Sequence, residues 1–131
     1  MRLLIAQVKG KPLALLYRAV VPGTAEGARV PFSSPWRTIT FDRVVTVKSV
    51  TVASAPTPGG YIVEVSVPWS VLGVQPKSGL KLKGDVGVLF GDGGTQTISR
   101  QYWSNKATGL VNDVPGEADL SPRLWGTFTL E

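Results

Sequence analysis

A chain of 131 residues with 43% apolar residues is long and apolar enough for one domain with a buried core, and its apolar runs are far shorter than the roughly 18 residues of a membrane span. The absence of histidine and cysteine excludes Ser-His-Asp and Cys-His nucleophilic systems, disulfides and most zinc sites, so we expect a single non-enzymatic domain over 1–131. The net charge of +5 originates in residues 1–60, whose eight Lys and Arg are spaced mostly singly, so we expect no nucleic-acid partner.

The chain opens with two short apolar runs, at residues 3–8 and 13–21. The Lys9-Gly10-Lys11-Pro12 segment between them is a turn signal of hairpin length, so we predict a hairpin. Gln7 and Lys9 end the first run before a signal-peptide apolar region of about 7–15 residues can form. We therefore expect no export signal in this chain.

Residues 22–42 form the longest stretch without clear periodicity, and a long loop inside a small domain is commonly functional or disordered. Trp36 lies near its end, between Pro35 and Arg37. Proline restricts the backbone beside the ring, and arginine places a cation next to it. Trp36 is a candidate binding platform; the alternative is a loop anchor that packs on the sheet.

The next segments are also typical of strands. Residues 43–54 alternate unevenly and residues 61–67 alternate cleanly after a Pro-Gly turn, so we predict that the two are antiparallel neighbours. Pro68 and Gly73 delimit a single helical turn. Residues 85–90 and 124–130 are two further predicted strands. The whole pattern predicts an all-β antiparallel sandwich or jelly roll with at most a short helical turn.

The segment 100–106 combines aromatic, amide and guanidinium groups in a sequence that we expect to be irregular. Tryptophan and tyrosine present flat apolar faces, while Arg and Asn provide directional hydrogen bonds, a combination that suits a sugar ring. The alternative is that Trp103 belongs to the core. We predict a ligand site formed by Trp103, Arg100, Tyr102 and Asn105, with Trp36 as an opposing ring.

Acidic residues near the C-terminus are candidate metal ligands. Asp113, Glu117 and Asp119 supply oxygen ligands of the kind that calcium prefers, and Asp92 in a Gly-rich turn adds another. Their spacing matches no calcium loop, and a solvated acidic loop is the alternative. We expect that binding requires no cofactor, and structural calcium is the candidate ion.

Several segments in order carry a resemblance to a known family. The run from Tyr61 to Gly73, the strand after Gly84, the aromatic loop at Tyr102 to Asn105 and the closing Leu124 to Phe128 resemble carbohydrate-binding module family 9 and its DOMON-like relatives. The resemblance covers roughly residues 43–131. It implies a β-sandwich that binds a saccharide between aromatic rings, usually with structural calcium, as an accessory module of a secreted or cell-surface protein.

The chain differs from that family at its start, because family members have further N-terminal strands that often contribute to the ligand site. We therefore expect a fragment or a reduced domain with an exposed sheet edge, which favours pairing with a second copy. Two functions follow as alternatives. One is an extracellular, non-catalytic carbohydrate-binding domain; the other is a structural or assembly domain, a homo-oligomer without a ligand site.

Overall fold

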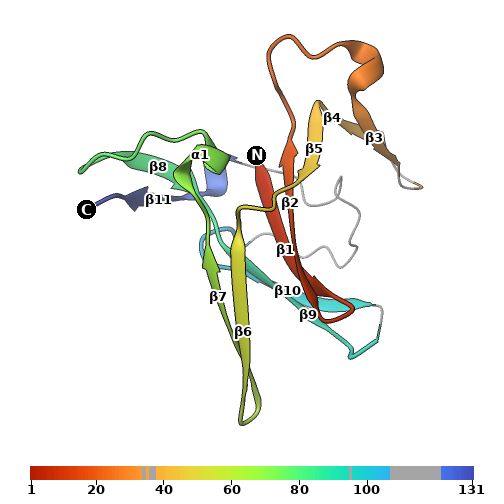
Figure 1. Cartoon of the computed structure of the whole chain (residues 1–131), viewed down its shortest axis with the longest axis vertical. Coiled ribbons are helices and arrows are strands. Elements are labelled where there is room, and N and C mark those ends of the chain that lie inside the picture. Colours follow the sequence, from red (N-terminus) through yellow and green to blue (C-terminus); the bar gives the residue numbers. More distant parts are fainter. Residues whose placement is uncertain (34, 36–37, 95, 107–121) are drawn as a thin grey trace. The chain divides into compact units, whose positions relative to one another are not determined.

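The structure is a computed structural model that describes residues 1–33, 35, 38–94, 96–106 and 122–131 (Figure 1). Its described residues form antiparallel strands and one short α-helix, with no closed barrel. This confirms the all-β antiparallel prediction. The chain divides into two compact units, which we call unit 1 (Met1–Pro31 with Thr40–Gln75) and unit 2 (Phe32–Ile39 with Pro76–Glu131). Stacking of the sheets into a sandwich, and the single domain, stay predictions.

Unit 1 is built on a three-stranded sheet in the order β1 (Arg2–Val8), β2 (Lys11–Arg18), β5 (Arg43–Thr46). The predicted N-terminal hairpin is confirmed, since Val8 pairs with Lys11 around a two-residue turn. Both turn residues have positive φ, 51° at Lys9 and 74° at Gly10. This is the backbone of a type I′ turn, whose twist matches that of the flanking strands.

The buried side chains of unit 1 lie around β2. Ala14, Leu16 and Tyr17 are buried there, and Phe41 at the end of β4 (Thr38–Phe41) joins them. The rings of Tyr17 and Phe41 meet edge to face with centroids 5.4 Å apart, a favourable aromatic geometry. The segment 22–42, for which we predicted no periodic element, contains a 3₁₀ turn, η1 (Glu26–Ala28), and the strand β3 (Val30–Ser33), which pairs with β4.

A second hairpin in unit 1 consists of β6 (Thr51–Thr57) and β7 (Gly60–Ser66), joined at Pro58 and Gly59. The predicted antiparallel pairing is confirmed for residues 51–54, but residues 43–46 belong to β5 and pair with β2. The predicted single strand is two strands because the chain leaves the ladder between them. The predicted helical turn is confirmed as α1 (Trp69–Leu72), which ends at Gly73 with φ 69°.

Unit 2 contains two antiparallel pairs. β9 (Gly87–Gly91) pairs with β10 (Thr97–Tyr102), and β8 (Lys81–Gly84) pairs with β11 (Gly126–Thr129), which follows the 3₁₀ turn η2 (Pro122–Leu124). The prediction that the segment 100–106 is irregular is wrong for residues 100–102. These residues form the end of β10 because their backbone pairs with residues 87–89 of β9. No helix within the described residues has the length and hydropathy needed to cross a membrane.

Candidate functional site

Four of the predicted ligand-binding residues line one open depression of unit 2, of about 780 Å³. Arg100 and Tyr102 come from the end of β10, and Trp103 and Asn105 follow directly after it. The other lining residues are Val86, Val88, Gln101 and Lys106. The predicted residues of segment 100–106 therefore lie at a strand end instead of within a free loop, and they are divided between the two faces of that strand pair.

The indole of Trp103 packs against other residues of unit 2 and still has a large exposed surface. Its side chain is 53% exposed, although its ring stacks on Phe128 with centroids 4.9 Å apart and planes at 29°. The ring also lies so close to Gly126 that a Cβ at that position would overlap it. Gly126 is the first residue of β11, and glycine permits such a close approach because it has no Cβ. Phe128 and Gly126 together support the ring, so Trp103 presents a fixed and accessible aromatic surface.

The alternation of β10 distributes its polar side chains between the two faces of the β9–β10 pair. Gln101 is paired with Val88 and shares its face, while Arg100 and Tyr102 belong to the other face. Trp103 continues the ladder, because its N–H donates to the Val86 carbonyl at 2.8 Å. Val86 and Val88 are 60% and 47% exposed, so the exposed face beside Trp103 consists of two valines and the Gln101 amide.

Arg100 and Tyr102 are half-buried, and the Tyr102 ring covers Gly87 so closely that a side chain there would clash with it. Asn105 is buried, at 7% exposure. The ammonium of Lys106 donates to the Tyr102 carbonyl at 2.6 Å, which ties the loop back to the strand. Trp103, Gln101, Lys106 and the two valines are thus the accessible members of the set. Asn105 has a position suited to supporting the loop.

Asp85, between β8 and β9, positions the loop that carries Trp103. Its carboxylate accepts the backbone N–H groups of Ser104 and Asn105, both at 2.8 Å, and that of Val86 at 2.9 Å. Burial acts to raise the pKa of Asp85, but the N–H groups of Asn105, Ser104 and Val86, helped by the charge of Lys106, hold that pKa below its ordinary value. Asp85 therefore stays ionised and keeps the loop in place.

The remaining predicted residues lie elsewhere. Trp36 and the acidic residues Asp113, Glu117 and Asp119 are outside the described residues. Asp92 accepts the N–H groups of Gly94 at 2.7 Å and Gln96 at 3.3 Å, so its carboxylate closes its own turn. Within the described part of the chain, no three acidic side chains come together in a group that could hold a metal ion.

Two residues of this site, Gln101 and Asp85, were not predicted from the sequence. Gln101 could have been predicted, because a strand that ends at Trp103 would place residues 101 and 103 on one face. From the sequence, Asp85 is only the first residue of the predicted strand 85–90, and nothing near it indicates a contact with the Trp103 loop. Its bonds to Ser104 and Asn105 span about 20 positions.

Comparison with known proteins does not place this chain in a family: no family model, curated protein or solved structure matches it.

Proposed function

We propose that this chain is a non-catalytic saccharide-binding domain that stacks a sugar ring on Trp103, an accessory role of the kind found in carbohydrate-binding module family 9. The observation that carries the proposal is the state of the Trp103 ring. It is 53% exposed and yet supported by Phe128 and Gly126. A ring that packed as a core residue would lose most of its accessible surface, whereas a platform needs one covered side and one accessible side.

The neighbours of the ring suit a sugar. A pyranose has apolar C–H patches and hydroxyl groups at its edge, so it needs an aromatic surface with hydrogen-bonding groups beside it. Val86 and Val88 extend the apolar surface, and the Gln101 amide both donates and accepts. One ring contributes about 1–3 kcal/mol when it stacks on a planar base, and a similar value for a sugar predicts micromolar to millimolar dissociation constants.

Binding without catalysis agrees with the chemistry of the loop. Asp85 contacts this loop through its carboxylate, whose oxygens accept three backbone N–H groups. Its lowered pKa makes it a weak base. We propose that Asp85 positions the loop and takes no part in a reaction.

The test is a titration with a panel of mono- and oligosaccharides, in calcium and in chelator, followed by tryptophan fluorescence and calorimetry. We expect saturable binding that Trp103→Ala abolishes and Trp103→Phe weakens, because phenylalanine keeps part of the stacking surface. Trp69→Ala is the matched control, since Trp69 lies in α1 of unit 1. Calorimetry is needed for Trp103→Ala, which removes the reporter ring as well as the platform.

If no sugar binds to the folded protein, or if Trp103→Ala binds as tightly as the wild type, the proposal is wrong. If sugar binds equally well in calcium and in chelator, the site needs no structural calcium, and that part of the proposal is wrong.

A second candidate function is assembly with another copy of the chain, and the β6–β7 hairpin favours it. Every residue of β7 is exposed, including Tyr61 at 63% and Ile62 at 56%. Val63 and Val65 share the face of Tyr61, so this face is apolar along the strand. Light scattering over a range of protein concentrations tests it. A monomer at all concentrations would contradict assembly, and a dimer that Val63→Lys dissociates would support it.

A further inference from the structure

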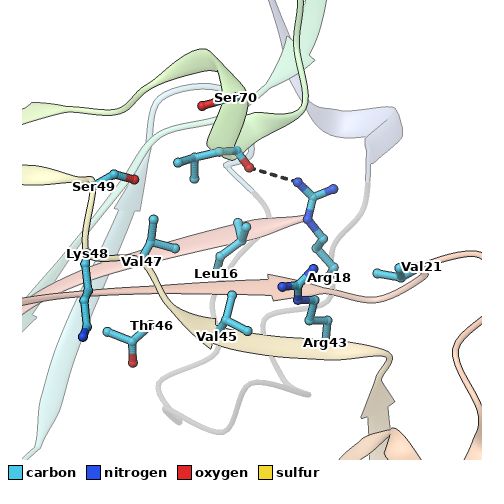
Figure 2. Close-up of a pocket in the computed structure, with 11 residues that line it drawn as sticks. Leu16, Arg18, Val21, Arg43, Val45, Thr46, Val47, Lys48, Ser49 and Ser70 are labelled. Carbon is cyan, nitrogen blue, oxygen red and sulfur yellow. Dashed lines mark hydrogen bonds between the residues drawn. The ribbon is translucent and has the colours of Figure 1, made fainter.

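A second depression, of about 690 Å³, lies within unit 1 between β2, β5 and α1 (Figure 2). Its apolar lining includes Leu16, Val45 and Val71. Three cationic side chains also line it: Arg18, Arg43 and Lys48. Among the described residues that line this depression, none is an aspartate or a glutamate. Arg18 and Arg43 lie on one face of the sheet, whereas the Lys48 side chain points away from them (Figure 2). An apolar depression with two neighbouring cations and no acidic residue is the arrangement of an anion site.

The two arginines are neighbours on adjacent strands of the sheet. Arg18 of β2 and Arg43 of β5 are direct partners in the antiparallel register, so their side chains share one face (Figure 2). Like charges directly opposite each other destabilise a strand pair. The repulsion between the two guanidinium groups therefore opposes this strand pairing, and an anion bound between them would relieve it.

Arg18 is held in place by the short helix. Its Nη2 donates to the carbonyl of Val71 at 2.9 Å, which occupies one of the five N–H donors of the guanidinium. Arg43 and Lys48 are exposed, so a ligand in solution can reach them. The fold thus orients Arg18, and Arg43 is accessible beside it, while Lys48 lies at the other end of the depression (Figure 2).

The acidic residue next to Arg43 is engaged elsewhere. Asp42 forms an ion pair with Arg29, with 3.0 Å between Nε and Oδ1, and it accepts the N–H of Val21 at 2.7 Å. The Asp42 carboxylate is thus occupied by Arg29 and Val21. Ser49 and Ser70 also line the depression and offer hydroxyl donors.

We propose that this depression binds an organic anion: a phosphate, sulfate or carboxylate group carried on a larger body. Arg18 and Arg43 bind the oxyanion, the charge of Lys48 attracts it from a greater distance, and the apolar walls contact the body of the ligand. A volume of about 690 Å³ is in the range of small-molecule sites and exceeds what a bare inorganic anion fills. The proposal goes beyond sugar stacking at Trp103, and it does not depend on it.

Calorimetric titration at constant ionic strength tests the site with glucose 6-phosphate, glucose 6-sulfate and glucuronate, and with glucose as the neutral control. We expect at least one anion to bind with a dissociation constant below about 5 mM, and glucose to give no signal from this site. Arg43→Gln should weaken the binding about tenfold, because it removes a charge-assisted contact, whereas Lys48→Gln should weaken it less, because it removes only a more distant charge. Which of the three anions binds most tightly identifies the anionic group.

Arg123→Gln is the matched control, because it removes the same charge from unit 2 and Arg123 does not line the depression. All titrations are repeated in Trp103→Ala, where anion binding should persist even if sugar stacking is lost. The outcome that refutes the proposal is a lack of saturation with all three anions up to about 10 mM. Equal affinity of Arg43→Gln and the wild type would refute it as well. Circular dichroism of each variant confirms the fold.

Discussion

Removing the Asp85 carboxylate should release the loop that carries Trp103. The carboxylate makes two bonds to a distant part of the chain, to the N–H groups of Ser104 and Asn105 at 2.8 Å each. A hydrogen bond to a charged group contributes about 1.5–3 kcal/mol, and solvent exposure reduces this to about 1 kcal/mol for each bond here. Asp85→Ala should therefore lower the free energy of unfolding by about 2 kcal/mol, and Asp85→Asn, which keeps one acceptor oxygen, by about half of that.

Urea denaturation followed by circular dichroism measures this loss. Asp92→Ala is the matched control, because Asp92 is also an aspartate in a turn but bonds only within that turn, to Gly94 and Gln96. We expect a clearly smaller loss for the control, because Asp92 is exposed and its hydrogen bonds compete with water. Equal losses in the two variants would show that the bonds from Asp85 to the Trp103 loop add no stability, and the assignment of Asp85 as the positioning residue would fail.

Three further predictions concern acidity, the support of the ring and the first turn. The pKa of Asp85 is lowered in the folded state, so its contribution to stability is present above its unfolded pKa near 4. This contribution is lost as the pH falls through the lower folded pKa. The urea midpoint of the wild type should therefore fall more steeply between pH 5 and 2 than that of Asp85→Ala. Gly126→Ala should cost about 1–3 kcal/mol and weaken sugar binding, because the new methyl group overlaps the Trp103 ring, whereas Gly27→Ala, with no neighbour within 4 Å of its Cβ, should be nearly neutral in the same denaturation assay. Lys9→Asn should stabilise the protein by about 0.5–1 kcal/mol, since Lys9 has φ 51° and asparagine tolerates that region better; no gain in the urea midpoint would contradict the type I′ assignment.

The elements that sequence reasoning located are those whose signal is local. The hairpin at Lys9 and Gly10 and the helical turn from Pro68 to Gly73 each depend on residues within a few positions of one another. The segment 43–54 was harder to assign, since its valines suit any strand. Its division into β5 and β6 follows from pairing with β2 and β7, and that choice of partner is made far along the chain.

The candidate site shows the same division. Residue types alone predicted a ligand site around Trp103, because aromatic rings beside amide and guanidinium groups suit a sugar ring. That site stays a prediction. The accessibility of the ring, however, depends on Phe128 and Gly126, more than 20 positions away, and its orientation depends on Asp85.

The sequence by itself determined the all-β antiparallel class, the turns and the candidate segment, because alternation and turn chemistry are properties of neighbouring residues. Only the tertiary structure decided that Trp103 rests on Phe128 with more than half of its side chain exposed, and that Arg18 stands opposite Arg43. The physical reason is that strand register joins residues far apart in the chain, and register sets which side chains share a face.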